Sequence, residues 1–278
     1  MTLKLGLIGD NIGASRAPRF HVLAGRQNGQ EVTYDRLVPQ EMGRDFDTLF
    51  DHVKAAGYRG INITYPYKER AAARVRIDDP GVRALGAVNT VLFDGDMPRG
   101  FNTDHSGFIA AWRKARGDAV PGVVLVIGAG GVGRAIGFAL ASLDAEEIRL
   151  ADTDLHRADA LATALRASFS GLRLRTGTDV AELAAGATGL VNATPVGMVG
   201  HDGTPLPPAM MRGAQWAFDA VYTPVETRFL RNAQAAGLQT ISGFELFIGQ
   251  AVDAWQLFSG LPLDEARLRA DLAAEEVT

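Results

Sequence analysis

A glycine-rich segment, Gly-Ala-Gly-Gly-Val-Gly at 128–133, lies between an apolar stretch typical of a buried strand and a helix-forming stretch. Gly128 would permit a tight turn, Gly130 would let the backbone approach a phosphate group, and Gly133 would let helix and strand pack closely. The first N–H groups of the helix would carry a partial positive charge. Asp152 ends the next strand-like stretch. The pattern predicts a loop that binds a dinucleotide.

Asp152 bears on which dinucleotide would bind. An aspartate at this place can accept hydrogen bonds from the ribose hydroxyls of NAD and would repel the 2′-phosphate of NADP, so the sequence favours NAD. Two other interpretations stay open, a glycine-rich turn without a ligand and the glycine loop of a methyltransferase. A methyltransferase usually carries an acid just before the loop, where this chain has Val126 and Ile127.

The elements that must position this loop follow a regular order. Apolar strands alternate with helices, the first two of which we expect over 134–143 and 156–169, and this order favours a parallel, doubly wound sheet. The six strands expected in this region are VVLVIG, EIRLAD, LRLRT, GLVNAT, WAFDAV and LQTIS. The Gly- and Pro-bearing segment 197–208 is predicted to be a loop.

The first third of the chain predicts a second, smaller α/β unit. A turn at 94–96 should return the chain into a hairpin. Strands are expected at 3–7, 31–39, 58–64, 87–93 and 99–103, and helices over 18–28, 40–56 and 67–76. Further helices are expected over 106–116, 246–260 and 263–276. The predicted fold class is therefore α/β, a Rossmann-type doubly wound domain plus a smaller α/β domain.

The composition excludes several kinds of chemistry. The 278 residues include no cysteine, which excludes disulfides, thiolate metal sites, iron–sulfur centres and a cysteine nucleophile. A net charge of −4 argues against a nucleic-acid surface, and no apolar run is long enough for a signal peptide or a membrane span. We therefore expect a cytoplasmic protein. Only four of its 28 basic residues are lysines, at positions 4, 54, 68 and 114.

Eight segments in order carry a family resemblance. They are GDNIGASRAPRFH, NITYPYKE, GAVNTV, FNTD, GAGGVG, VNATPVGM, DAVYTP and GFELFIGQAVDAW. With these segments the chain resembles the shikimate/quinate dehydrogenase family over essentially its whole length, and the ADTD segment looks more like its NAD-using branch. The resemblance implies a substrate-binding domain formed by 1–104 and 242–278, an NAD-binding domain over 105–241, and a cleft between them.

The resemblance implies Lys68 and Asp104 as the catalytic pair. Oxidation of a secondary alcohol removes a hydride, which NAD accepts, and a proton, which a lysine can accept while a carboxylate orients the groups. Each residue also has an ordinary interpretation. Lys68 could be a solvated lysine at a helix start, and Asp104 could be the N-terminal cap of the helix expected over 106–116.

Other family positions imply contacts to substrate and cofactor. A polyhydroxylated ring carboxylate needs hydroxyl and amide partners, and the matching residues are Ser15, Thr64, Asn89, Tyr222 and Gln250. Taken alone, Asn89 could be a turn amide, Thr64 a strand residue and Gln250 an exposed helix residue. The cofactor positions are Gly128, Gly130, Gly131, Val132, Gly133, Asp152, Arg157, Asn192, Thr194, Val196, Met198, Val221 and Gly243.

Some positions depart from the family pattern. The first motif usually has two hydroxyl residues that contact the substrate carboxylate, and here the second is Ala17, although Arg16 could substitute. In the last motif Leu246 replaces a methionine, and Glu245 would add negative charge if it faced the substrate. A paralogue acting on another ring carboxylate, such as an amino-substituted one, stays open, as does a non-catalytic NAD-binding sensor.

The resemblance also implies partners and a setting. We expect a small-molecule substrate, NAD, no metal, no nucleic acid and no membrane, with a homodimer as one permitted assembly. The pathway would be either aromatic amino acid biosynthesis or quinate catabolism.

Overall fold

The computed structural model describes residues 2–274, which fold into two compact units. The first unit combines the chain up to Thr103 with the chain from Ala251 onward, and the second is Asp104–Gln250. The second division falls inside the helix α10 (Gly243–Ser259). The end of the helix predicted over 263–276 lies outside the described residues, whereas α11 (Glu265–Ala274) accounts for the rest.

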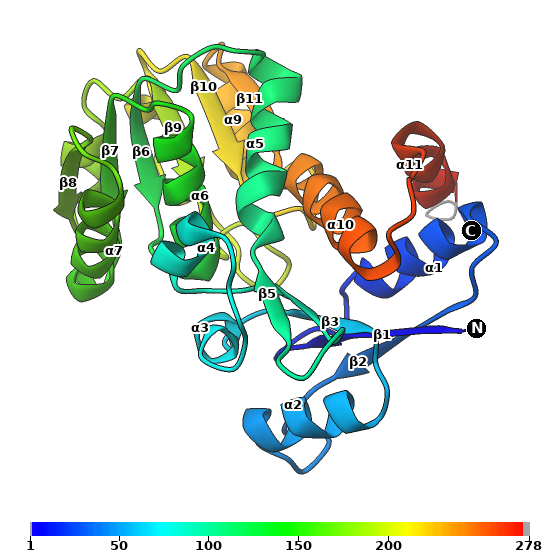
Figure 1. Cartoon of the computed structure of the whole chain (residues 1–278). Helices are drawn as coiled ribbons and strands as arrows, with labels where there is room; N and C mark the ends of the chain where they lie inside the picture. Colours follow the sequence, from blue (N-terminus) through cyan, green and yellow to red (C-terminus); the bar gives the residue numbers. More distant parts are fainter. Residues whose placement is uncertain (1, 275–278) are drawn as a thin grey trace. The chain divides into compact units, whose positions relative to one another are not determined.

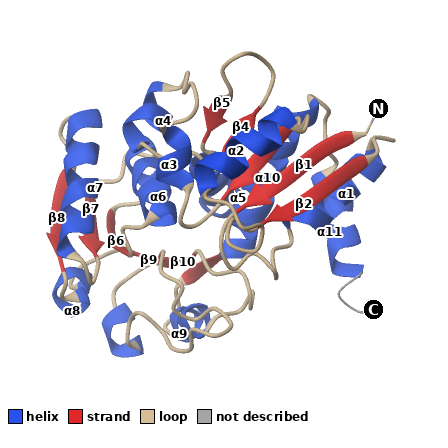
Figure 2. Cartoon of the chain, turned by 90° about the horizontal axis from the view of Figure 1, so that it is seen from below, coloured by secondary structure: helices blue, strands red, loops and turns tan. Residues whose placement is uncertain are grey.

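A five-stranded sheet forms the first unit, in the order β2-β1-β3-β4-β5. Its strands are β1 (Leu3–Ile8), β2 (Val32–Leu37), β3 (Gly60–Ile63), β4 (Thr90–Leu92) and β5 (Arg99–Phe101). β1 is parallel to both β2 and β3, and Figure 2 shows β1 beside β2. β3–β4 and β4–β5 are antiparallel, so the hairpin predicted at 94–96 is confirmed.

The helices of the first unit are α1 (Ala17–Gln27), α2 (Phe46–Ala55), α3 (Lys68–Ala72), α4 (Pro80–Leu85), the end of α10, and α11, which packs against α1. The predicted start of a helix at residue 40 is wrong, because turns occupy 40–43 and the Asp45 carboxylate caps α2 by accepting from the Thr48 N–H at 2.8 Å. The helix α4 was not predicted, although Asp79 caps it and Gly86, with φ of +71°, ends it.

The core of the first unit is packed from both ends of the chain. Leu5 and Leu92 form a buried cluster with Ala254 and Phe258 of α10. A Cβ at Gly60 of β3 would overlap the Phe258 ring, so this glycine lets α10 approach the sheet closely. The C-terminal segment is therefore an integral part of this unit.

The second unit contains six parallel strands in the order β11-β10-β9-β6-β7-β8 (Figure 1). They are β6 (Val123–Ile127), β7 (Glu147–Ala151), β8 (Arg173–Gly177), β9 (Gly189–Asn192), β10 (Trp216–Asp219) and β11 (Gln239–Ser242). This is the doubly wound order of a dinucleotide-binding domain, so the predicted Rossmann-type sheet is confirmed. Its helices are α5 (Thr103–Arg116), α6 (Gly131–Ser142), α7 (Leu155–Ser168), α8 (Val180–Ala184), the 3-10 helix η1 (Pro208–Met211), α9 (Arg228–Ala235) and the first part of α10.

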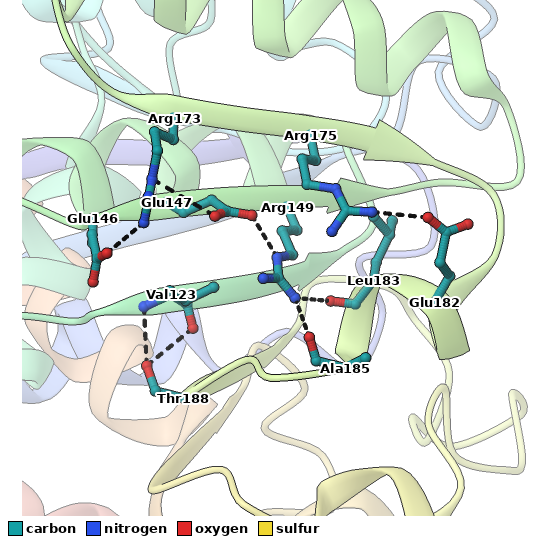
Figure 3. Close-up of polar contacts among 10 residues, drawn as sticks. All are labelled: Val123, Glu146, Glu147, Arg149, Arg173, Arg175, Glu182, Leu183, Ala185 and Thr188. Carbon is teal, nitrogen blue, oxygen red and sulfur yellow. Dashed lines mark hydrogen bonds and ion pairs between the residues drawn. The ribbon is translucent and has the colours of Figure 1, made fainter.

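Charged side chains hold the starting edge of this sheet. Figure 3 shows Arg149 of β7 turned toward the segment after β8, where its guanidinium donates to the Ala185 carbonyl at 2.6 Å and pairs with Glu147, also at 2.6 Å. Arg173, the first residue of β8, pairs with Glu146. Glu146, Glu147 and Arg173 lie at or just before the first residues of β7 and β8, whereas a doubly wound sheet binds its ligand at the opposite edge, where the strands end.

Within residues 2–274, no helix is long and apolar enough to cross a membrane. The same residues contain no group of three or more His, Asp or Glu side chains that could hold a metal ion.

Candidate functional site

The glycine loop between β6 and α6 has the shape that the sequence predicts. Gly128 has φ of +100°, a conformation that a side chain would strain. A Cβ at Gly133 would overlap the Gly128 carbonyl oxygen, whereas a Cβ at Gly130 would have nothing within 4 Å. Gly128 and Gly133 therefore allow the turn and its packing, and Gly130 leaves room for a ligand. No side chain caps α6, which begins at Gly131, so its first N–H groups suit an anion.

Asp152 follows β7 and is attached to this loop. One carboxylate oxygen accepts from the Ala129 N–H at 2.7 Å, and the other accepts from the Asp154 N–H at 2.9 Å. A carboxylate can accept about four hydrogen bonds, so capacity for ribose hydroxyls is left. The Asp152 side chain is thus positioned by backbone donors, and the residues present fit a dinucleotide.

A buried amide shapes the loop after β9. Asn192 is fully buried, and its side-chain Nδ2 donates to the Val196 carbonyl at 2.9 Å. Its Oδ1 accepts from both the N–H and the hydroxyl of Thr194, at 3.0 and 2.7 Å. The predicted cofactor positions Asn192, Thr194 and Val196 therefore form one hydrogen-bonded turn at the strand-end edge of the sheet.

The other predicted cofactor positions lie in neighbouring segments of this unit. Val221 is buried after β10, and Gly243 begins α10 so close to the Ala220 carbonyl that a Cβ would meet it at 2.6 Å. Met198 lies partly exposed in the loop after β9. Arg157 is exposed in the first turn of α7 and pairs with Asp154 at 3.7 Å.

Lys68 is the first residue of α3 and is only 8% exposed. The interpretation as a solvated lysine is therefore wrong. The turn before it is held by Tyr67, whose ring stacks on Phe46 with centroids 4.9 Å apart and whose hydroxyl donates to Asp10 at 3.0 Å. Burial of a lysine is uncommon, and here it follows from the packing of this turn.

Asn89 is buried just before β4 and belongs to a side-chain network. Its Oδ1 accepts from the Thr103 N–H at 2.7 Å and from the Thr90 hydroxyl at 3.1 Å, while its Nδ2 donates to the Thr103 hydroxyl at 3.1 Å. The Asn89 side chain thus joins the start of β4 to the start of α5. One of the two Nδ2 hydrogens serves Thr103, and an amide nitrogen carries a second.

Asp104 is not the N-terminal cap of its helix, which corrects the ordinary interpretation of this residue. The helix α5 begins at Thr103, one residue before Asp104, and the Asn89 side chain accepts from the Thr103 N–H. Asp104 lies in the first turn and is 6% exposed. A carboxylate at this place is stabilised by the helix dipole.

Ser15 and Thr64 lie in the segments that follow the parallel strands β1 and β3. Ser15 precedes α1; its hydroxyl accepts from the Ala17 N–H at 3.3 Å, and its carbonyl accepts from Arg36 at 2.9 Å. Thr64 directly follows β3, and its N–H donates to the Ile8 carbonyl at 2.9 Å. Ala17 itself is buried at the start of α1.

The remaining predicted substrate residues belong to the second unit. Tyr222 stacks on Phe247 of α10 with ring centroids 5.0 Å apart. Gln250 is half-buried on α10, where a Cβ at Gly107 of α5 would meet the Gln250 backbone at 2.7 Å. Gly107 thus allows α5 and α10 to approach closely, and Gln250 is not the exposed residue of the ordinary interpretation.

Glu245 has a charged partner. Its carboxylate accepts from the Lys114 ammonium of α5 at 2.8 Å. The negative charge of Glu245 is therefore offset within the second unit.

Two buried titratable residues escaped the sequence reasoning. Burial lowers the pKa of His21 to about 3, and its ring stacks on Tyr34 at 5.0 Å. Burial raises the pKa of Asp219 to about 6 at the end of β10. A signal was available for Asp219, because a charged residue ends an otherwise apolar strand.

Comparison with known proteins agrees with this geometry. Residues 7–91 match the family model described as the shikimate dehydrogenase substrate binding domain. A quinate/shikimate dehydrogenase (NAD(+)) of Corynebacterium efficiens is 40% identical, with 97% of each chain covered. The chain belongs to the shikimate/quinate dehydrogenase family of oxidoreductases.

Other members of the shikimate/quinate dehydrogenase family differ in their named cofactor. A shikimate dehydrogenase (NADP(+)) of Arthrobacter is 36% identical over 99% of this chain and 97% of its own. The structure of a quinate dehydrogenase from Corynebacterium glutamicum in complex with NAD superimposes with a TM-score of 0.90 at 35% identity, covering 98% of this chain and 99% of that one. The family thus includes NAD- and NADP-named enzymes of the same fold.

Proposed function

We propose that this family member is an NAD-dependent dehydrogenase that interconverts a ring hydroxyl and a ketone in quinate- or shikimate-type ring carboxylates. The observation that carries the proposal is Lys68, a buried lysine at a helix start in a chain 40% identical to a relative named quinate/shikimate dehydrogenase (NAD(+)). A lysine, unlike an arginine, can take part in proton transfer, because the guanidinium group of arginine stays charged.

Lys68 would accept the proton of the substrate hydroxyl, and Asp104 would orient the hydroxyl and the ammonium group. When bound, NAD supplies the acceptor for the hydride. Burial of the Lys68 side chain lowers the local dielectric constant, so its interactions with a substrate oxygen are stronger than in water. In the reverse direction the protonated Lys68 would donate to the ketone oxygen.

Ser15, Thr64, Asn89, Tyr222 and Gln250 would bind the substrate through hydroxyl and amide groups. Asn89 supports this role because its network holds the amide in one orientation and leaves an Nδ2 hydrogen for a ligand. A prepositioned donor loses little entropy when the substrate binds.

Preference for NAD over NADP follows from Asp152. Its carboxylate is held against the glycine loop by the Ala129 N–H, so it cannot swing away without losing a charge-assisted hydrogen bond. A 2′-phosphate placed there would meet a fixed negative charge. Relatives named for NAD and for NADP both exist, so this residue, rather than the fold, carries the preference.

The role of Lys68 is tested by NADH formation with quinate and with shikimate, in the wild type and in Lys68→Ala. We expect kcat to fall by about 10²- to 10⁴-fold in the variant, the usual contribution of a general base. Lys54→Ala is the matched control, because Lys54 is an exposed lysine in the same unit that donates to the Asp96 carbonyl. Full activity of Lys68→Ala would contradict the proposal.

Ala17 favours one second candidate, a dehydrogenase for a different ring carboxylate. A hydrogen bond to a charged carboxylate contributes about 1.5–3 kcal/mol, and Ala17 cannot provide one with its side chain. A panel of cyclic hydroxy acids, amino-substituted ones included, distinguishes the two candidates. Strong turnover of quinate or shikimate would remove the second.

A further inference from the structure

Asp219 is a buried carboxylate with no cationic partner among the described residues. It ends β10 at 0% exposure, and its hydrogen-bond donors are the Asn192 Nδ2 at 2.9 Å, the Val221 N–H at 3.0 Å and the Thr227 hydroxyl at 2.5 Å. Burial raises the pKa of this carboxyl to about 6, although the three hydrogen bonds lower it in part. Burying a carboxylate without a countercharge costs free energy.

The three donors come from three different segments. Asn192 ends the neighbouring strand β9, Val221 lies in the loop after β10, and Thr227 is the N-terminal cap of α9. Figure 1 shows β9, β10 and α9 within the same unit, where β9 and β10 are paired in the sheet. One side chain therefore joins two loops and a helix start at the strand-end edge, where a doubly wound sheet binds its ligand.

The bond to Asn192 extends the effect of Asp219 into the loop after β9. The Asn192 Nδ2 carries two hydrogens, one directed to Asp219 Oδ1 and the other to the Val196 carbonyl. With Nδ2 so oriented, Oδ1 of Asn192 faces Thr194, which it holds by two hydrogen bonds. Asp219 thereby selects one orientation of the amide, and the amide selects one shape of the loop.

We propose that Asp219 is a positioning residue for two cofactor-binding loops. Through Asn192 and Val221 its carboxylate holds the backbone of 193–198 and 220–222 in the shape that receives the cofactor. This inference rests on the proposed function, since that function assigns Asn192, Thr194, Val196, Met198 and Val221 to the cofactor.

Substitutions of Thr227 test the hydrogen bonds of Asp219 without changing Asp219 itself. Its hydroxyl donates to Asp219 Oδ2 and accepts from the Leu230 N–H at 3.2 Å, so it joins the carboxylate to the first turn of α9. Serine preserves both bonds. Valine has nearly the same shape as threonine but removes both bonds, so the pair Thr227→Ser and Thr227→Val separates hydrogen bonding from volume.

The test compares the wild type with Asp219→Asn, Thr227→Val and Thr227→Ser. For each protein it measures kcat, the KM for NAD, the KM for the substrate at saturating NAD, the Kd for NADH and the melting temperature. Asparagine removes the negative charge, which weakens the hydrogen bonds from Asn192 and Val221. It also turns the oxygen that accepts from Thr227 into a donor. We expect the KM for NAD and the Kd for NADH to rise about tenfold in Asp219→Asn, which corresponds to about 1.4 kcal/mol. The substrate KM should change less than the KM for NAD.

The Thr227 variants distinguish a loss of cofactor binding from a loss of folding. Thr227→Val should move the KM for NAD in the same direction and by less, and Thr227→Ser should restore the wild-type value. If Asp219→Asn fails to fold, the comparison of Thr227→Val with Thr227→Ser tests the inference by itself. A lowered melting temperature with unchanged nucleotide parameters, or equal behaviour of Thr227→Val and Thr227→Ser, would overturn the inference.

The two proposals fail in different ways. A wild type that binds NADH but turns over no ring hydroxy acid contradicts the proposed reaction, while the binding comparison still tests Asp219. A wild type with the expected activity and an unaffected Asp219→Asn variant contradicts only the positioning role.

Discussion

The candidate residues of the two units differ in the atoms that they offer to a ligand. In the second unit the main chain forms the glycine loop, with Gly128 at a positive φ and an open position at Gly130. In the first unit side chains supply the candidate groups, with Lys68 buried at the start of α3 and Asn89 buried just before β4. A site made of backbone is damaged by adding an atom, whereas a site made of side chains is damaged by removing one.

The units also differ in the buried group that titrates. The first unit buries a neutral base, since the pKa of His21 is lowered to about 3. The second buries an acid, since the pKa of Asp219 is raised to about 6. The same burial acts on opposite charge types, so the two units should respond to pH in opposite directions.

The largest expected effect is this divergence under acid. Below pH 6.5 His21 binds a proton in the unfolded chain but stays neutral in the native one. The free energy of unfolding of the first unit therefore falls by about 3 kcal/mol by about pH 4.5. Native Asp219 binds a proton below pH 6 before the unfolded residue does, so the second unit gains stability as the pH falls toward 3.8. Hydrogen exchange followed by mass spectrometry reports the two units separately.

Two variants sharpen this pH comparison. His21→Phe keeps a buried ring and should flatten the pH dependence of the first unit, and Asp219→Asn should flatten that of the second. If both units lost protection from hydrogen exchange in parallel as the pH falls, the predicted difference between the units would be contradicted.

The next effect concerns the glycine loop. Gly133→Ala places a Cβ against the Gly128 carbonyl oxygen, and such overpacking costs about 1–3 kcal/mol, so the KM for NAD should rise roughly tenfold to 100-fold. Gly137→Ala is the matched control in the same helix, because its Cβ would meet only leucine side chains, at 3.6 Å. Equal kinetics of the two variants would show that the loop does not hold the cofactor.

The smallest effect concerns cofactor choice. Asp152→Asn removes the negative charge while keeping one oxygen for the Ala129 N–H, so the ratio of kcat/KM for NADP to that for NAD should rise about tenfold. Asp154→Asn serves as the control, since asparagine also caps helices and Asp154 caps α7. An unchanged ratio in Asp152→Asn would refute the role given to this carboxylate.

The difference between a site made of backbone and one made of side chains also explains how much of each could be predicted from the sequence. The glycine loop could be predicted because its spacing records a steric requirement, the lack of a Cβ at Gly128 and Gly133. The sheet of the second unit followed from alternating apolar strands. Lys68 could not be assigned from its own surroundings, since a lysine beginning a short helix is usually solvated, and only the family resemblance pointed to it.

The errors have physical causes as well. The cap interpretation of Asp104, which the sequence left open beside the catalytic one, suits its residue type, but the Asn89 side chain, distant in sequence, accepts from the first helical N–H instead. Asp219 was overlooked because its three partners come from segments that meet only in the folded sheet. The predicted start of α2 at residue 40 ignored the capping aspartate at position 45.

The central claim is that this chain oxidises a ring hydroxy acid with NAD. Its most direct test is the rate of NADH formation by the wild type with quinate and shikimate, each measured with NAD and with NADP. We predict turnover of at least one of the two acids, with a higher kcat/KM for NAD than for NADP. NAD binding without turnover of either acid, or a higher kcat/KM for NADP, would contradict the account.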